Sequence, residues 1–134
     1  MSYNIISKGA RVDVYRIKLF ADSQGNQPIK EYLAALAQGT DKDSRVKLGK
    51  VDYYMQALRN YGTRAGEPFV KHIEGEIWEL RPLRDRFFFF CWQGNHFILL
   101  HHFVKKTQKT PKKELDQAKR NLKDFIERSE RGEY

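Results

Sequence analysis

The sequence predicts a single α+β domain of 134 residues, in which helices pack against a mostly antiparallel sheet. Apolar residues follow a helical period through residues 28–61, and from Phe69 they follow the alternating period of strands. A helical period returns after Pro111. A chain of this length can bury a core without disulfides. The expected order is therefore a strand, two helices, a strand meander and a last helix.

The first twenty residues predict an irregular arm followed by an edge strand. Residues 1–11 show weak periodicity, so we expect an irregular arm or a short added strand there. From Val12 to Phe20 the chain alternates, with Tyr15, Ile17 and Leu19 pointing to one side. This pattern is typical of a half-buried strand at the edge of a sheet.

Two helices are expected next, joined by a short loop. Pro28 suits the first turn of a helix, and Gly39 suits its end. Asp41 or Asp43 can cap the second helix, which Gly62 ends. The two apolar stripes consist of Ile29, Tyr32, Leu33 and Leu36, and of Leu48, Val51, Met55 and Leu58. The short loop predicts an antiparallel helical hairpin.

The second half of the chain predicts a meander and a closing helix. The expected strands are Val70–Ile73, Glu76–Arg81, Arg86–Trp92 and His96–Val104. Because Arg86–Trp92 is apolar on both faces, it should be a central strand covered on each side. Thr110 should cap the last helix, with Pro111 at its first position. The inner face of that helix should comprise Leu115, Ala118, Leu122, Phe125 and Ile126.

Charge and composition limit the partners and the compartment. The net charge of +8 and the pI near 9.6 fit nucleic acid, an acidic protein or a membrane surface as partner. No apolar run is long enough to span a membrane, and no signal peptide is recognisable at the N-terminus. The single cysteine, Cys91, lies in the aromatic run RFFFFCW, so we expect a buried, unreactive thiol in a reducing compartment, the cytoplasm.

Several kinds of site are excluded by the sequence. It contains neither a glycine-rich phosphate loop nor a Ser/His/Asp signature with a nucleophile elbow. The four histidines lack the spacing of metal ligands, so neither a metal nor another cofactor is expected. His101 and His102 are neighbours in a strand and should point to opposite faces.

Basic residues at the strand ends are the strongest functional signal. Arg81 and Arg86 flank one tight connection, and the end of the following hairpin strand should return to them. Guanidinium groups match phosphate oxygens and can stabilise a phosphorane, while histidine or lysine can transfer protons. The predicted catalytic residues are Arg81, Arg86, His101, Lys105 and Lys106.

Structural explanations exist for some of the same charges. Arg81 can instead be the ion-pair partner of Glu79 or Asp85, and Lys105 and Lys106 can simply terminate an edge strand. The lysines at the start of the last helix can instead be the solvent-exposed face of that helix, without a role in binding.

The segment GEIWELRPLRDRFFFFCWQGNHFILLHHFVKKTQKTPKKELDQAKR resembles the HigB-like branch of the RelE/ParE toxin superfamily and its phage-derived relatives. The segments PIKEYLAAL and YGTRAGEPFVKHIEG resemble the same branch, so that the resemblance spans residues 13–128. It implies a curved antiparallel sheet flanked by helices (a RelE-like fold). It also implies a ribosome-dependent endoribonuclease that needs no metal and cuts mRNA in the ribosomal A site.

The resemblance also implies partners and site positions. A helix-turn-helix antitoxin would neutralise the toxin in a heterotetrameric complex, and operator DNA would be bound only through that antitoxin. The family's basic positions fall on Arg81, Arg86, Lys105 and Lys106. The residues expected to bind RNA and the ribosome are Lys71, His72, Lys109, Lys112 and Lys113.

Two other functions remain open on sequence grounds. A ParE-type toxin would inhibit gyrase by binding protein, although that branch tends to lack this basic cluster. A phage regulatory protein with the same fold would bind RNA without cutting it. Some toxins of the superfamily use a tyrosine near the C-terminus, where this chain has only Tyr134.

Overall fold

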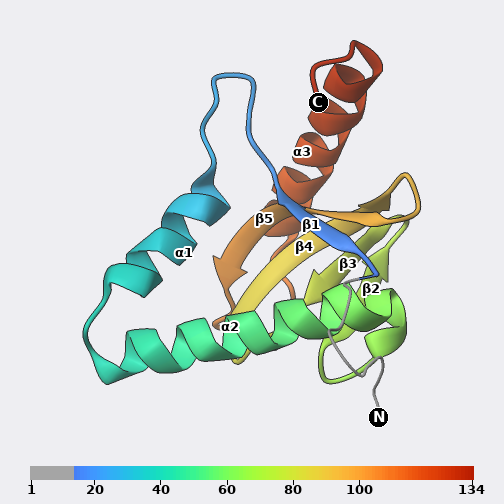
Figure 1. Cartoon of the computed structure of the whole chain (residues 1–134). Helices are drawn as coiled ribbons and strands as arrows, with labels where there is room; N and C mark the ends of the chain where they lie inside the picture. Colours follow the sequence, from blue (N-terminus) through green and yellow to red (C-terminus); the bar gives the residue numbers. More distant parts are fainter. Residues whose placement is uncertain (1–13) are drawn as a thin grey trace.

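The computed structural model describes residues 14–134, and the expected arm at residues 1–12 lies outside this range. The regular elements follow the expected order (Figure 1). They are β1 (Arg16–Leu19), α1 (Pro28–Gln38), α2 (Lys42–Tyr61), the 3₁₀ helix η1 (Gly62–Ala65), β2 (Val70–Glu74), β3 (Ile77–Leu80), β4 (Asp85–Trp92), β5 (His96–Val104) and α3 (Lys112–Glu130).

The five strands form one open sheet in the order β1-β5-β4-β3-β2. β2 to β5 form the predicted antiparallel meander, and the edge strand β1 pairs with β5 in parallel. The α+β class and the mostly antiparallel sheet are therefore confirmed. The parallel pair arises because α1, α2 and three strands separate β1 from β5 in the chain, which allows a long crossover connection.

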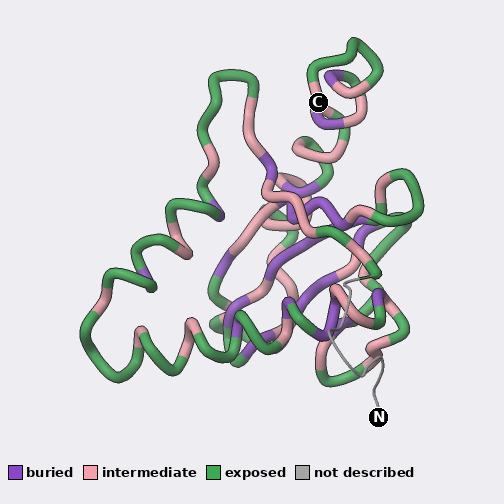
Figure 2. Tube along the Cα trace, viewed as in Figure 1, coloured by how far each residue is buried: buried purple, intermediate pink, exposed green. Residues whose placement is uncertain are grey.

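Helices cover both faces of the sheet, so β4 is buried on both sides (Figures 1 and 2). Phe87 and Phe89 pack with the α1–α2 side of the core. Phe88 and Phe90 pack with residues of α3 and their neighbours. The prediction of a central strand covered on each face is confirmed.

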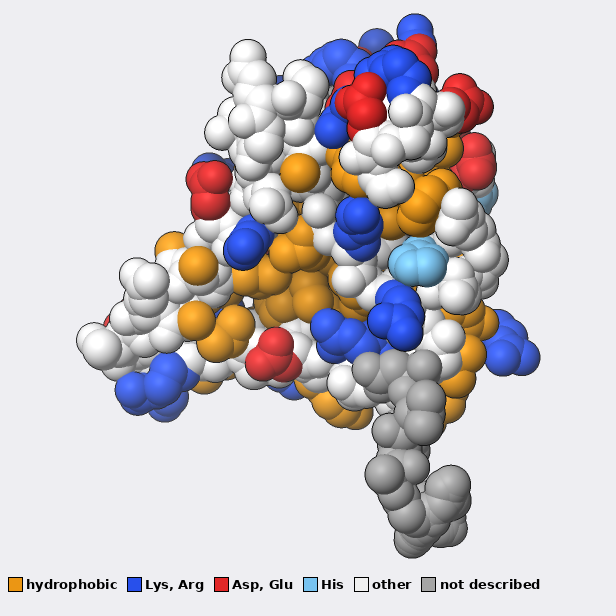
Figure 3. All heavy atoms as spheres, turned by 45° about the horizontal axis from the view of Figure 1, so that its top comes forward, with side chains coloured by type: hydrophobic (Ala, Val, Ile, Leu, Met, Phe, Trp, Pro, Cys, Tyr) orange, Lys and Arg blue, Asp and Glu red, His pale blue; other side chains and the backbone are white. Residues whose placement is uncertain are grey.

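The first two helices meet at a short loop and diverge from it as the arms of a V (Figure 1). Asp41 caps α2 by accepting a hydrogen bond from the backbone N–H of Ser44 at 3.0 Å. Gly39 and Gly62 stand at the C-terminal ends of the two helices, as expected. The space between α1 and the sheet is a hollow lined by hydrophobic side chains (Figure 3).

A β-bulge interrupts the β4–β5 pairing. Phe88 pairs with His101 and Phe89 with Leu99, so Leu100 is the additional residue on β5. Its carbonyl oxygen accepts a hydrogen bond of 2.7 Å from the side-chain amide of Asn121 in α3. The bulge and α3 therefore hold each other in place.

Two local predictions are wrong. Pro111 is itself the N-cap of α3, and no side chain caps this helix, so Thr110 does not have the predicted role. Cys91 is exposed rather than buried, although the four phenylalanines before it in β4 are buried. Partial burial still raises the pKa of the Cys91 thiol, which favours the unreactive protonated form.

In the part of the chain that the structure describes, no helix is long and apolar enough to cross a membrane.

Candidate phosphate-binding pocket

Four of the five predicted catalytic residues line one pocket of about 400 Å³, which we call the basic pocket. It lies where the β3–β4 turn meets the chain that leaves β5. Its lining residues are Arg81, Leu83, Arg84, Arg86, Lys105, Lys106, Thr107 and Gln108. Five of these eight side chains are cationic. Among the residues that the structure describes, no acidic side chain and no histidine lines the pocket. The pocket is therefore suited to an anion.

Backbone hydrogen bonds fix the walls of the basic pocket. The β3–β4 turn is closed by a bond from the N–H of Asp85 to the carbonyl of Pro82 at 3.0 Å. The N–H of Lys105 donates to the carbonyl of Arg84 at 2.8 Å, and Nε of Arg84 donates to the carbonyl of Lys105 at 3.1 Å. The turn and the end of β5 are thus joined, which brings cations from distant parts of the sequence together.

A buried carboxylate connects two of the arginines. Oε1 of Glu79 lies 3.3 Å from Nε of Arg81 and 3.7 Å from Nε of Arg86. The Glu79 side chain is only 1 % exposed, and its Oε2 has no hydrogen-bond partner in residues 14–134. Burial raises the pKa of Glu79, although the positive charges of Arg86 and Arg81 oppose this shift. One acid therefore orients two guanidinium groups and leaves excess positive charge for a ligand.

The other guanidinium nitrogens hold the arginines in one orientation. Nη1 of Arg81 pairs with Glu67 at 3.1 Å. Nη1 of Arg86 donates to the carbonyls of Leu83 at 2.8 Å and Asp85 at 2.9 Å. Within residues 14–134, Nη2 of each arginine makes no hydrogen bond. Two oriented donors are therefore available to phosphate oxygens.

Lys105 lines the basic pocket in an environment that favours loss of its proton. Burial lowers its pKa, the nearby positive charges of Arg86 and Arg81 lower it further, and Glu79 acts in the opposite direction. A lysine with a lowered pKa gives up its proton more readily, so this group is a candidate general acid or base.

The predicted RNA-binding residues lie at varying distances from the basic pocket. Lys71 lies opposite Glu79 in the β2–β3 pair, and its charge acts on both Glu79 and Lys105. The adjacent His72 points to the other face, where Nε2 is 2.8 Å from the Gly75 carbonyl oxygen. The exposed residues Lys109, Lys112 and Lys113 are outside the pocket lining.

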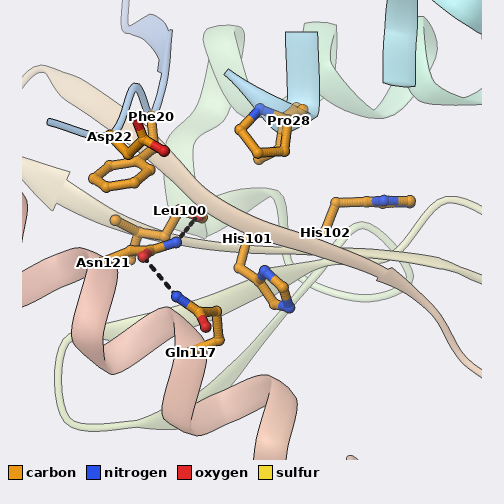
Figure 4. Close-up of a pocket in the computed structure, with 9 residues that line it drawn as sticks. Phe20, Asp22, Pro28, Leu100, His101, His102, Gln117 and Asn121 are labelled. Carbon is orange, nitrogen blue, oxygen red and sulfur yellow. Dashed lines mark hydrogen bonds between the residues drawn. The ribbon is translucent and has the colours of Figure 1, made fainter. Parts of the chain in front are cut away.

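The fifth predicted catalytic residue, His101, lines a different cleft of about 350 Å³ beside α3 (Figure 4). Its Nε2 lies 2.7 Å from Oε1 of Glu114. His102 extends to the opposite side of the strand, as predicted (Figure 4). The structure thus separates His101 from the cationic residues with which the sequence grouped it.

A buried polar network behind the basic pocket was missed by the sequence reasoning. Oδ1 of Asp85 is 2.8 Å from Nε2 of His102 and accepts a hydrogen bond of 2.7 Å from the Tyr32 hydroxyl. Lys47 lies 3.9 Å from the other oxygen. Burial favours a higher pKa for Asp85, but the hydrogen bonds from His102 and Tyr32 outweigh it, so that the pKa is lowered. The sequence signal that could have indicated this network is the position of Asp85, an acidic residue at the start of an apolar strand.

Arg84, Leu83 and Glu79 were also absent from the predicted site. Arg84 stands between Arg81 and Arg86 in the sequence LRPLRDR, so the same connection could have indicated it.

The described residues contain no group of three histidine, cysteine or acidic side chains placed to hold a metal ion.

Comparison with protein-family models matches residues 38–123 to the family described as Phage derived protein Gp49-like (DUF891). No curated protein matches the chain. The matched range extends from the α1–α2 loop into α3, and it contains every residue that lines the basic pocket. It covers more than half of the chain, which therefore belongs to the Gp49-like family.

Proposed function

We propose that this Gp49-like protein is the toxin of a type II toxin–antitoxin pair and an endoribonuclease that cuts mRNA in the ribosomal A site. The observation that carries the proposal is the basic pocket, where Arg81, Arg86, Lys105 and Lys106 converge from three parts of the sequence. The family match and the resemblance of the WELR and HHFVKKTQKTP segments to HigB-like toxins support the same function.

The pocket chemistry suits cleavage by the RNA's own 2′-hydroxyl. Arg81 and Arg86 would hold the non-bridging oxygens of one phosphodiester and stabilise the charge that develops on them. The 2′-oxygen attacks phosphorus, its proton passes to a base, and the bond to the 5′-oxygen breaks as that oxygen gains a proton. The products are a 2′,3′-cyclic phosphate and a 5′-hydroxyl. Because cationic side chains supply the charge stabilisation, this route needs no metal.

Lys105 is the group we assign to proton transfer. It lines the pocket, and burial lowers its pKa. A positioned proton-transfer group contributes roughly 10²–10⁴-fold to a rate. His101 stays a candidate only if RNA binding or the ribosome rearranges its contact with Glu114, 2.7 Å away.

The proposed partners are those that the resemblance to HigB-like toxins implies. Ribosomal and messenger RNA would contact the basic pocket and the surrounding lysines, Lys71, Lys109, Lys112 and Lys113. A helix-turn-helix antitoxin would cover the pocket with an acidic segment, in a heterotetramer that contacts operator DNA through the antitoxin alone. RNA binding and antitoxin binding would both take place in the cytoplasm.

Purified protein added to free mRNA and to translating ribosomes tests the proposal. We expect cuts within codons only when ribosomes are present. Arg86→Gln should reduce the cleavage rate by at least about 100-fold, because it removes transition-state charge stabilisation. Arg120→Gln is the matched control: this exposed arginine of α3 lies outside the pocket lining, donates a hydrogen bond to Gln117 at 2.7 Å, and should leave the rate within about threefold when replaced.

A second function is favoured by one observation: among the described residues, the basic pocket has no histidine or carboxylate in its lining. A protein that binds RNA without cutting it fits such a site. Tight RNA binding with no cuts under any condition would select this function. Intact RNA together with altered DNA supercoiling would instead select a gyrase inhibitor.

A further inference from the structure

An exposed leucine lies among the cations of the basic pocket. Leu83 lines the pocket, and 47 % of its surface is accessible to solvent. It belongs to none of the three hydrophobic core clusters in residues 14–134. A large apolar side chain in this position requires an explanation other than core packing.

The backbone of Leu83 is also strained. Its φ is +55°, which L side chains rarely adopt. Leu83 is the second residue of the turn from Pro82 to Asp85, and a positive φ there with a negative φ next is the type II′ pattern, in which glycine is usual. Folding of the turn alone would therefore favour glycine at this position.

Neighbouring contacts hold the strained residue in place. The Leu83 carbonyl accepts a hydrogen bond of 2.8 Å from Nη1 of Arg86, a predicted phosphate ligand. Arg84, the next residue, is bonded twice to the backbone of Lys105. Strained residues persist where the surroundings over-determine them, and such positions cluster at binding sites.

We propose that Leu83 is a specificity-determining contact that packs against the face of an unpaired nucleobase next to the bound phosphate. The inference rests on the proposed function. Phosphate oxygens account for the cations but not for an aliphatic side chain between them. Single-stranded RNA presents an apolar base face beside each phosphate, so one ligand accounts for both features of the pocket.

The test compares two probes that differ only in their bases. One is a 2′-O-methyl RNA octamer, which cannot be cleaved, and the other is the same backbone with abasic positions. We expect Leu83→Gly to bind the octamer roughly tenfold more weakly, since it loses the apolar contact, and to bind the abasic probe as the wild type does. Leu83→Met, which keeps an apolar side chain, should bind both probes like the wild type.

The outcomes separate this inference from the function on which it rests. A wild type that binds neither probe overturns RNA binding itself. Equal octamer binding by wild type and Leu83→Gly overturns only the role of Leu83. If both variants bind RNA normally but Leu83→Gly loses binding to an acidic antitoxin peptide, the leucine serves a protein partner and the nucleobase contact is refuted. The melting temperature of Leu83→Gly should not fall, because glycine relieves the strain.

Discussion

Tyr32→Phe should destabilise the protein by removing one hydrogen bond behind the basic pocket. The Tyr32 hydroxyl donates to Oδ1 of Asp85 at 2.7 Å, and the Asp85 side chain is only 1 % exposed. The same Asp85 supplies the N–H that closes the β3–β4 turn. The substitution therefore tests whether the network supports the turn that carries the pocket.

The size of the effect follows from the partners that remain. Without the hydroxyl, the Asp85 carboxylate retains His102 at 2.8 Å and the more distant Lys47 at 3.9 Å. A hydrogen bond to a charged group contributes about 1.5–3 kcal/mol, so the free energy of unfolding should fall by about 2 kcal/mol. For a domain of this size the melting temperature should fall by roughly 5–10 °C.

Urea denaturation, with thermal melting as a second readout, measures this change. Tyr53→Phe is the matched control, because the Tyr53 side chain is exposed and its hydroxyl has no partner in residues 14–134. The control should change the free energy of unfolding by less than about 0.5 kcal/mol. Equal stabilities of Tyr32→Phe and Tyr53→Phe would refute the role assigned to the network.

The buried carboxylates of Asp85 and Glu79 should make the free energy of unfolding depend on pH with opposite signs. The pKa of Asp85 is lowered below 3.8 in the folded protein, so its stabilisation is present above about pH 4 and is lost as pH falls through the folded pKa. The difference in unfolding free energy between wild type and Asp85→Asn should therefore shrink below pH 4 in urea denaturation. The pKa of Glu79 is raised above 4.5, so its contribution is present at low pH and is lost as pH rises; Glu79→Gln should gain stability relative to wild type between pH 4 and 7. Gly62→Ala should cost about 2–3 kcal/mol of unfolding free energy, because its φ is +63° and a Cβ would lie 2.9 Å from the Tyr15 ring. Gly94→Ala, at φ +77° with nothing within 4 Å of the new Cβ, should cost only about 1 kcal/mol, and equal costs for the two would contradict the close approach of Tyr15.

The fold was predictable because its elements differ in period. The change from helical to alternating spacing at Phe69 located the meander, and the doubly apolar run Phe87–Phe90 located the central strand. The exposure of Cys91 was not predictable, because in the sequence this residue only continues the apolar run RFFFFCW. The parallel β1–β5 pair is likewise a long-range contact that leaves no local signal.

The candidate site was predictable only where topology forces residues together. Arg81 and Arg86 flank one tight turn, and the hairpin partner of β4 returns to that turn, so the meander alone brings Lys105 beside them. His101 lies in the same strand, but α3 crosses its face and Glu114 binds it. Sequence periodicity does not specify where a helix crosses a sheet, so this separation required the structure.

Mapping the 5′ ends of cellular mRNA after induction of the protein tests most directly whether the basic pocket cuts RNA. We expect new 5′-hydroxyl ends within translated codons for the wild type. We expect none for the double variant Arg81→Gln, Arg86→Gln, provided that the variant is folded and present at the same level. Cuts by this double variant at the wild-type sites and rate would contradict the claim that the basic pocket binds the phosphodiester that is cut.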